Sequence, residues 1–294
     1  MSQSRRSTPR DTGSTGLTTH SGIIHLDQPR VKGFQQNSEA KLSANRVIVT
    51  GGNGDIGSAM GARLFNDGFS VTLLDLKAPS EVREEVKALI ALSQDGHDLN
   101  YRQADVTDRA RVDEVFSEFE NDLFVVMANA GIGKSEPFLD ITETYWNQHL
   151  DINLTGVFHT LQSAARIFVK NKRPGQIIIT GSWVGTVPWP EIAAYSATKA
   201  AVEMLAKSAA RELSGYKIRV NVIAPGIVNA GLARHQLETE PQYAARVAKV
   251  VPLKELQTAE QVADIASFLC SKSGDYFTGS TILADGGASL FQFD

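Results

Sequence analysis

Tyr195 and Lys199 are the two residues of this sequence whose types and spacing point most directly to chemistry. They stand four positions apart in the run AYSATKA, residues 194–200, whose small residues are typical of a helix. At that spacing both side chains lie on one helical face, so the ammonium group lies beside the phenol. A cation in that place favours the phenolate and lowers the tyrosine pKa below its usual value of about 10. The pair is therefore a candidate proton-transfer device, although such pairs also occur by chance on helices.

A glycine loop precedes this pair in the chain. The β-branched run Arg46–Thr50 is followed by GGNGDIG, residues 51–57, and then by a helical pattern over 58–65. Strand, glycine turn and helix in this order form the context of a dinucleotide-binding fingerprint. The glycines allow close approach of the backbone, and a diphosphate rests on the free amides at the helix N-terminus. The alternative is an ordinary glycine-rich turn.

The end of the next predicted strand indicates which dinucleotide would bind. Residues 70–74 predict that strand, and Asp75 follows it, eighteen positions after Gly57. A carboxylate there accepts hydrogen bonds from both ribose hydroxyls of NAD and repels the 2′-phosphate of NADP. We therefore expect NAD as the cofactor, with NADP less favoured, unless Asp75 merely ends the strand.

Short motifs further along the chain complete a pattern that is specific in its order and spacing. From about Arg46 to Gly287 the chain resembles the compact, single-domain branch of the short-chain dehydrogenase/reductase superfamily. Besides the loop and the pair, the motifs that carry this resemblance are Asp105 in ADV, Asn129-Ala130-Gly131, Asn153 in DIN, Ser182, Pro225-Gly226 and FTGSTILADGG at 277–287.

The resemblance implies an enzyme that interconverts a secondary alcohol and a ketone and moves a hydride to or from nicotinamide. It assigns proton transfer to Tyr195, and it implies that Lys199 lowers the Tyr195 pKa and bonds the nicotinamide ribose. Ser182, directly after a strand predicted at 176–180, would orient and polarise the substrate carbonyl. Asn153 would hold a water that links Lys199 to solvent. Without the resemblance, Ser182 is better explained as a turn former or a helix cap.

The resemblance also implies the cofactor contacts. Asp105 would meet the adenine, and Asn129 would brace the central strand beside the cofactor. The cofactor-binding residues that we expect are Gly51, Asn53, Asp55, Ile56, Asp75, Asp105, Val106, Asn129, Ala130, Gly131, Tyr195, Lys199, Pro225, Gly226 and Val228.

Three positions depart from the family pattern. Asp55 stands where the compact branch usually has glycine, which leaves a glycine spacing more typical of the extended, sugar-nucleotide branch. A carboxylate there repels a diphosphate unless its side chain points away or bonds loop amides as a helix cap. The other departures are Ala128, where another asparagine is common, and Ala230, where a threonine commonly touches the carboxamide and Asn229 is the candidate substitute.

Strands and helical stretches alternate along the chain, which predicts an α/β fold with a parallel sheet. The fold we predict over residues 45–294 is a single-domain Rossmann-type doubly wound parallel sheet with helices on both faces. From the resemblance we expect a homodimer or a homotetramer. The predicted strands are 46–50, 70–74, 99–103, 123–128, 176–180, 217–223 and 280–284, and the clearest helices are 80–94, 110–121, 145–170 and 192–214.

Residues 1–44 form a basic arm, with six Lys and Arg against three Asp and Glu. Its Ser, Thr and Gly content and its few large apolar residues predict disorder. It lacks the apolar core of a secretion signal, so we expect a cytoplasmic protein. Two alternatives stay open: a basic organellar leader, and a contact of residues 22–34 with a neighbouring subunit.

Composition excludes several other classes of function. A net charge of −4 is the opposite of the basic charge that nucleic-acid binding favours. No apolar stretch approaches the length of a membrane span. The single cysteine, Cys270, allows no internal disulfide, which fits a reducing compartment. The six histidines show no ligand spacing, so we expect no metal.

The cofactor preference and the residues between Ser182 and Pro252 indicate the class of substrate. NAD more often serves oxidation, so a polyol, sugar or hydroxy acid is favoured. An NADPH-dependent ketone or 3-oxoacyl reductase, a sugar-nucleotide epimerase and a non-catalytic NAD(H)-binding sensor or scaffold are the alternatives. Trp183 and Trp189 would wall the pocket and stack on a ring, or else belong to the core. The segment from 227 to 252, here called the lid segment, could attract an anion through Arg234, His235, Arg246 and Lys249.

Overall fold

The computed structural model describes residues 19–20, 23–24, 45–93 and 98–290. Within a separate unit over residues 1–33, the two-residue strands Thr19–His20 (β1) and Ile23–Ile24 (β2) pair in antiparallel fashion. The rest of the arm predicted over 1–44 lies outside the described residues. Its disorder, the leader, the subunit contact and the domain boundary at residue 45 therefore stay predictions.

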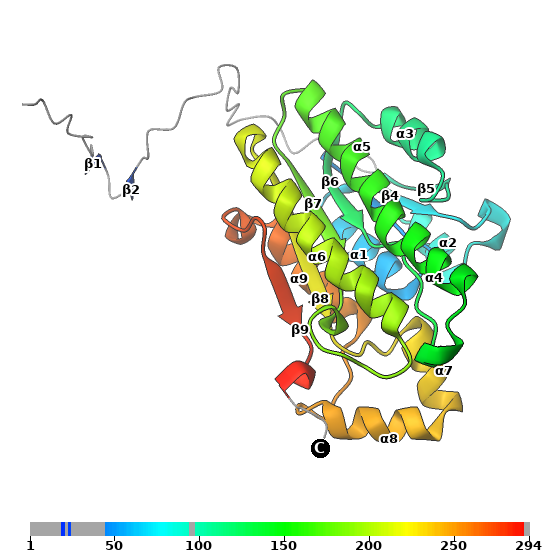
Figure 1. Ribbon diagram of the computed structural model, residues 1–294. Coiled ribbons are helices and arrows are strands. Elements are labelled where there is room, and N and C mark those ends of the chain that lie inside the picture. Colours follow the sequence, from blue (N-terminus) through cyan, green and yellow to red (C-terminus); the bar gives the residue numbers. More distant parts are fainter. Residues whose placement is uncertain (1–18, 21–22, 25–44, 94–97, 291–294) are drawn as a thin grey trace, which may run out of the picture. The chain divides into compact units, whose positions relative to one another are not determined.

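Seven parallel strands form the sheet of the second unit (Figure 1). In the order β5-β4-β3-β6-β7-β8-β9, the chain builds outward from β3 to β5 and then returns to the other side of β3. The sheet thus has a switch point between β3 and β6, where ligands of such folds bind. All seven predicted strands are confirmed, and they are Arg46–Thr50 (β3), Ser70–Asp75 (β4), Leu99–Gln103 (β5), Leu123–Ala128 (β6), Gly175–Thr180 (β7), Ile218–Pro225 (β8) and Thr281–Ala284 (β9).

Helices cover both faces of this sheet. One apolar core joins the sheet to α3, α5 and α6, which lie on the near face in Figure 1, and a second core joins it to α1, α2 and α9. Neighbouring strand residues serve different cores because successive side chains point to opposite faces, as Ile48 and Val49 do. This is the doubly wound Rossmann-type fold that was predicted. The helices are Asp55–Asn66 (α1), Glu84–Ile90 (α2), Arg109–Glu118 (α3), Glu143–Leu150 (α4), Gly156–Lys170 (α5), Ala193–Leu213 (α6), Gly231–Thr239 (α7), Pro241–Val250 (α8) and Ala259–Cys270 (α9).

The helix predicted over 145–170 is interrupted. A π-helical turn, Asp151–Thr155, separates α4 from α5. The turn carries Asn153, whose side chain is bonded to a neighbouring loop, and it leads into Gly156, where a Cβ atom would lie 2.6 Å from Val106. Periodicity could not reveal this widening because it depends on contacts with other parts of the fold.

The helix predicted over 80–94 begins later, at Glu84. Val82 and Arg83 are extended, and the Arg83 amide donates to the Asn53 side chain at 3.0 Å instead of starting a helix. The glycine loop therefore shapes the segment that follows β4.

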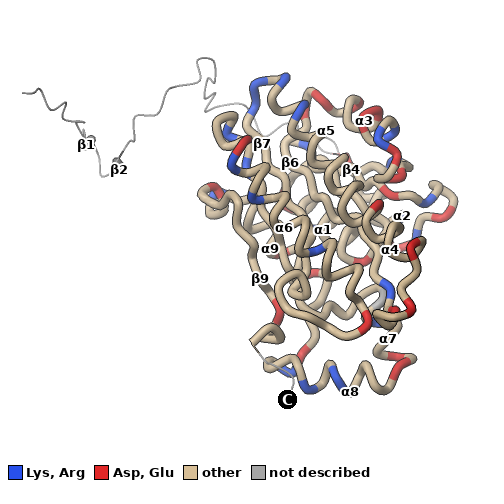
Figure 2. The backbone as a smooth tube through the Cα atoms, in the orientation of Figure 1, with Lys and Arg blue, Asp and Glu red and all other residues tan. Residues whose placement is uncertain are grey.

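Charges of both signs are interspersed around the molecule, and the face formed by α5 and α6 is mostly uncharged (Figure 2). No helix among the described residues combines the length and apolar character needed to cross a membrane.

A buried arginine of β3 binds β4 and the residues directly before β5 and β6 at the amino ends of the sheet. Arg46, the first residue of β3, donates to Asp98 at 2.7 Å, to Asp122 at 2.9 Å and to Thr72 at 3.1 Å. Its guanidinium also lies 4.5 Å from the centre of the Phe119 ring. Arg46 is buried, whereas Asp98 and Asp122 keep partial exposure. These hydrogen bonds therefore replace the water contacts that the guanidinium loses on burial.

We predict that Arg46→Met lowers the free energy of unfolding by about 2–4 kcal/mol, because it leaves two carboxylates without their cation. The matched control is Arg102→Met, which removes a half-exposed pair with Glu118 and should cost less than about 1 kcal/mol. Urea unfolding measures both values. Equal losses in the two variants would contradict the role given to Arg46.

Candidate active site

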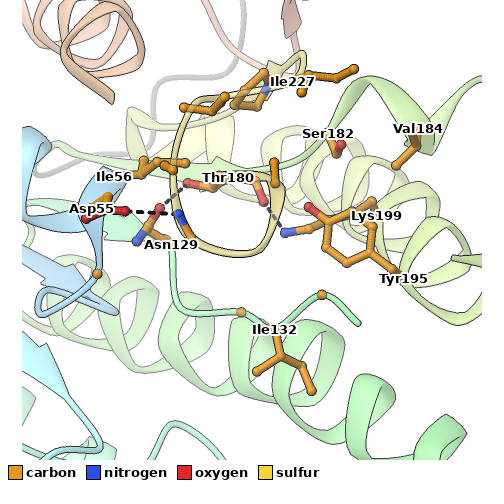
Figure 3. Close-up of a pocket in the computed structure, with 18 of the residues that line it drawn as sticks. Asp55, Ile56, Asn129, Ile132, Thr180, Ser182, Val184, Tyr195, Lys199 and Ile227 are labelled. Carbon is orange, nitrogen blue, oxygen red and sulfur yellow. Dashed lines mark hydrogen bonds between the residues drawn. The ribbon is translucent and has the colours of Figure 1, made fainter. Parts of the chain in front are cut away.

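A cavity of about 400 Å³ lies at the carboxyl ends of the strands. The glycine loop, the ends of β6, β7 and β8, the start of α6 and the lid segment all contribute to its walls. Asp55 and Ile56 stand on one side of it, and Ser182, Tyr195 and Lys199 stand on the other (Figure 3). The switch point of the sheet thus opens into one continuous pocket.

Helix α6 brings Tyr195 and Lys199 to the same wall of this pocket. The Lys199 Nζ atom lies 5.4 Å from the centre of the Tyr195 ring. The same atom donates a hydrogen bond of 2.7 Å to the carbonyl oxygen of Thr180, the last residue of β7. Lys199 is almost fully buried, so this bond fixes its ammonium group between helix and sheet.

Burial governs the acid–base properties of the pair. It lowers the pKa of Lys199 to about 8, because desolvation disfavours the ammonium form. It raises the pKa of Tyr195 above its ordinary value, and the hydrogen bond with the Ser182 side chain only partly opposes this. The net pKa of Tyr195 is therefore raised by burial, and the lowering of this pKa by Lys199 stays a prediction. The Lys199 ammonium is itself desolvated, and it donates to the Thr180 carbonyl.

Ser182 comes shortly after the end of β7, where the chain lies close to β8. A Cβ atom at Gly181 would lie 2.6 Å from Val222 of β8, so the backbone passes close to its neighbour there. The Ser182 carbonyl accepts a hydrogen bond of 2.9 Å from Gly185 and starts the short 3-10 turn Trp183–Gly185. The serine is nearly buried, and its hydroxyl faces Tyr195.

Asn153 reaches the site from the π-helical turn. Its Oδ1 accepts from the Ile132 amide, and its Nδ2 donates to the Ile132 carbonyl, each at 2.8 Å. Its Nδ2 also donates to the Thr198 hydroxyl at 3.3 Å. The side chain is fully buried and clamps the loop after β6 to helix α6. The water link to Lys199 stays a prediction, whereas the clamp is an additional task that the sequence did not reveal.

Asn129 links three strands on the cofactor side of the pocket. Its Nδ2 donates to the Thr50 carbonyl and its Oδ1 accepts from the Thr180 hydroxyl, each at 3.0 Å. The Thr50 hydroxyl accepts from the Asn129 and Ala130 amides, also at 3.0 Å. Thr50 and Thr180 are supporting residues that sequence analysis missed, because threonine at a strand end is too common to mark them.

The glycine loop has the close geometry that its residues predict. Gly51 has a φ of +68°, and a Cβ atom at Gly57 would lie 2.1 Å from the Gly51 carbonyl oxygen. Neither position can carry a side chain without moving the loop. Asp75 lines the pocket beyond the loop and accepts hydrogen bonds from the amides of Asn53, at 3.0 Å, and Lys77, at 3.2 Å.

Asp55 is bonded to groups outside the loop. It accepts from Arg83 at 2.5 Å, from the Gly231 amide at 2.9 Å and from Arg234. Burial alone would raise the pKa of Asp55, but the Gly231 amide and the two arginines outweigh it and lower the pKa below its usual value. The carboxylate is thus paired with two cations, which offsets its expected repulsion of a diphosphate.

Most of the predicted cofactor contacts line the cavity, but some do not. The Asp105 carboxylate accepts from the amide and hydroxyl of Thr107, both at 2.8 Å, and Val106 packs under Gly156. Asn229, the candidate substitute for a missing threonine, is exposed and lies outside the lining. The predicted residues on the lining are Gly51, Asp55, Ile56, Asp75, Asn129, Ala130, Gly131, Tyr195, Lys199, Pro225, Gly226 and Val228, and those off it are Asn53, Asp105 and Val106.

The substrate side of the pocket is walled by aromatic and aliphatic side chains. Trp183 and Trp189 meet edge to face at 5.2 Å, and Tyr243 of α8 meets Trp189 at 6.2 Å. Gln236 and Ser135, joined by a hydrogen bond of 2.8 Å, form a polar spot among them. Sequence analysis missed Tyr243 and Gln236, because no motif marks the lid segment.

The basic residues of the lid segment that were predicted to attract an anion do not line the cavity. Arg234 pairs with Asp55, and Arg246 lies 3.8 Å from Glu191. Neither these two nor His235 and Lys249 belong to the lining. An anionic substrate therefore finds no free cation from the lid segment.

A family model described as enoyl-(acyl carrier protein) reductase matches residues 52–289. The chain belongs to the short-chain dehydrogenase/reductase superfamily. It is an NAD(P)-dependent oxidoreductase that acts on CH–OH groups.

Curated relatives cover most of the chain. 3beta-hydroxysteroid dehydrogenase 1 of Eggerthella lenta is 34% identical over 258 residues, which is 86% of this chain and 97% of the relative. L-2,3-butanediol dehydrogenase of Corynebacterium glutamicum is also 34% identical, over 82% of this chain and 97% of its own. These two names describe different secondary alcohols.

Solved structures agree with the fold and differ in cofactor. A putative 2-deoxy-D-gluconate 3-dehydrogenase from Agrobacterium tumefaciens with bound NADP matches with a TM-score of 0.76 and 26% identity, over 84% of this chain and 97% of its own. A short-chain dehydrogenase from Mycobacterium paratuberculosis bound to NAD matches with a TM-score of 0.74 and 27% identity, over 86% and 100%. Family membership alone therefore leaves both cofactors open.

We predict that Asn153→Asp lowers kcat by about 10-fold or more, because a carboxylate cannot donate to the Ile132 carbonyl and instead repels it. The clamp then loosens on the side where Lys199 lies, since Gly131 borders both Asn153 and Lys199. Steady-state kinetics measure kcat and KM, and urea unfolding measures any general loss of stability. A variant that loses stability but keeps kcat would show that Asn153 acts on the fold alone.

Proposed function

We propose that this protein is an NAD-dependent oxidoreductase that interconverts an uncharged secondary alcohol and its ketone. The observation that carries the proposal is the meeting of the Ser182 hydroxyl, the Tyr195 phenol and the Lys199 ammonium in one pocket that also opens onto the glycine loop. The lining holds no second group of side chains that combines a hydroxyl, a phenol and an ammonium.

The pocket suits a dinucleotide. Ile56 and Gly57 line it at the first turn of α1, where backbone amides have no acceptor within the helix and favour a diphosphate. Asp75 stands beyond the loop, in the position for ribose hydroxyls, and Lys199 stands on the opposite side, where the nicotinamide ribose would lie. A nicotinamide bound here would supply hydride transfer, and the residues that would hold its ribose and diphosphate are Lys199, Asp75 and the amides at the start of α1.

The chain's own residues would handle the proton. The Ser182 hydroxyl donates to the substrate oxygen and orients it towards Tyr195. The Tyr195 phenolate would take the hydroxyl proton during oxidation, and the resulting phenol would return it during reduction. Lys199, held by Thr180, stabilises the phenolate electrostatically and orients the ribose. Asn153 would carry the relay onward through a water, and the apolar walls would exclude bulk solvent.

The preference for NAD rests on Asp75. Asp75 lines the pocket, and the residue directly after it is the exposed Leu76 rather than a cation that would attract a 2′-phosphate. Both observations support NAD over NADP.

The lining supports a substrate without charge. Trp183, Trp189 and Tyr243 offer ring faces and edges, and the nearby polar spot of Gln236 and Ser135 offers one place for a hydroxyl or carbonyl. Of the substrates favoured from the cofactor alone, a hydroxy acid has the least support and a sparsely hydroxylated ring or short diol has the most. The ketone-reductase alternative shares this chemistry, and a sensor would bind NADH without turnover.

Three further features belong to the proposal. Phe158 of α5 and Met204 of α6 are exposed apolar side chains. Helices α5 and α6 are also mostly uncharged (Figure 2), and both features support pairing of copies into a homodimer or homotetramer through these helices. We also propose a cytoplasmic location and a catalytic domain that starts near residue 45.

We predict that Asp75→Ser raises the ratio of kcat/KM with NADP to kcat/KM with NAD by about 10-fold or more, because it removes both the ribose acceptor and the repulsion of the 2′-phosphate. Initial rates with both cofactors measure this ratio. Asp105→Ser is the control, since any contact with adenine affects both cofactors alike. An unchanged ratio in Asp75→Ser would remove the basis for preferring NAD.

We predict that Tyr195→Phe lowers kcat by about 10²–10⁴-fold while NADH still binds, because only the proton-transfer group is lost. Absorbance of the reduced nicotinamide, across cyclic alcohols, diols, sugars and hydroxy acids, measures turnover. Wild-type binding of NADH with no turnover across this panel would support the sensor instead.

The same assay tests the sign of the pH dependence. Oxidation needs the phenolate, so its rate rises with pH, whereas reduction needs the phenol and its rate falls as pH rises. Burial already raises the Tyr195 pKa. A variant without the Lys199 cation loses a charge that favours the phenolate, so its inflection should lie at still higher pH. We expect Lys199→Met to move the profile in that direction, and a shift to lower pH would contradict the role of the lysine.

A further inference from the structure

A series of hydrogen bonds links the cofactor side of the pocket to the lid segment. Asp75 accepts from the Asn53 amide, and the Asn53 side chain accepts from the Arg83 amide, each at 3.0 Å. The Arg83 guanidinium then donates to Asp55 Oδ1 at 2.5 Å. The series thus runs from the end of β4, through the glycine loop, to the first residue of α1.

Asp55 continues the series to helix α7. Its second oxygen, Oδ2, accepts from the Gly231 amide at 2.9 Å and from the Arg234 guanidinium. Gly231 is the first residue of α7, so both contacts hold the start of this helix. Two residues further along, Ala233 lines the pocket, and Gln236 follows one turn later. One carboxylate therefore bridges the glycine loop and the lid segment.

The ion pairs of Asp55 with Arg83 and Arg234, here called the bridge, are too exposed to serve mainly the stability of the fold. Asp55 keeps 21% of its side chain exposed, and Arg83 and Arg234 keep 37% and 45%. Pairs at such exposure contribute little to fold stability. Two guanidinium groups meet one carboxylate here, and Arg83 also lies 3.5 Å from the exposed Glu85. Asp55 thereby holds both cations near the amides at the start of α1, where a diphosphate would lie.

We propose that Asp55 is a positioning residue for the cofactor, which holds Arg83 and Arg234 beside the diphosphate site and ties helix α7 to the glycine loop. This inference rests on the proposed dinucleotide site. Cofactor release then requires the bridge to open together with the lid segment. The residue that departs from the family's glycine thereby gains a function instead of merely weakening the loop.

The alternative, in which Asp55 acts only through its negative charge, predicts the opposite change in NADH binding when that charge is removed. If Asp55 acted only as a negative charge near the diphosphate, its removal would tighten NADH binding. If it positions two arginines and the lid segment, its removal loosens binding and speeds release. Measuring the sign therefore separates the two.

The experiment measures the NADH dissociation rate by stopped-flow fluorescence in the full-length protein. Asp55→Asn keeps the shape and an acceptor for the Gly231 amide but removes the charge that holds the arginines, and Arg234→Gln removes one partner. We expect each to raise the dissociation rate about five- to tenfold, with the double variant no faster than the singles because both break the same bridge. Arg246→Gln is the matched control, a lid-segment arginine that pairs with Glu191, and should leave the rate unchanged.

Hydrogen exchange provides a readout that does not depend on the cofactor. In the protein alone, the amides of residues 231–239 should exchange faster in Asp55→Asn than in wild type, and no faster in Arg246→Gln. Tighter NADH binding in Asp55→Asn, additive effects in the double variant, or unchanged exchange in α7 would each overturn the proposal. Absence of NADH binding to wild type would instead refute the proposed function, and the exchange result would still decide whether Asp55 holds α7.

Discussion

The hydrogen bond from the buried Lys199 ammonium to the Thr180 carbonyl is the contact on which the site depends. It joins helix α6 to the carboxyl end of β7, so it sets where Tyr195 and Ser182 stand relative to each other. Thr180 is held in turn by Asn129, which is bonded to Thr50 of β3. A buried ammonium without such an acceptor would lose its proton. The central strands therefore support the proton-transfer group and the glycine loop through one set of bonds.

Burial has two consequences for this group. It lowers the Lys199 pKa to about 8 and raises the Tyr195 pKa, so neither side chain by itself makes the phenol a ready base. The charge balance of the pocket then determines how readily the phenol ionises. The apolar walls of Trp183 and Trp189 strengthen every such interaction by keeping water away.

The departure at Asp55 illustrates how a local conflict is resolved by distant residues. Next to the amides at the start of α1, a carboxylate alone would compete with a diphosphate. Arg83 comes from the segment after β4, and Arg234 comes from α7, and both reach the same side chain. Neither arginine could have been assigned to Asp55 from spacing, because 28 and 179 residues separate them from it in the chain.

The sequence by itself determined the seven strands, the doubly wound class and the pairing of Tyr195 with Lys199, because burial patterns and helical spacing are local properties. Only the tertiary structure decided which residues meet across the pocket. It gave Asn153 a clamp on Ile132 from a π-helical turn, moved Arg234 from the substrate side to Asp55, and left Asp105 off the lining. It also showed that Lys199 bonds Thr180 and that burial sets both pKa values. These features depend on packing between segments far apart in the chain, and no local pattern records the free energy of that packing.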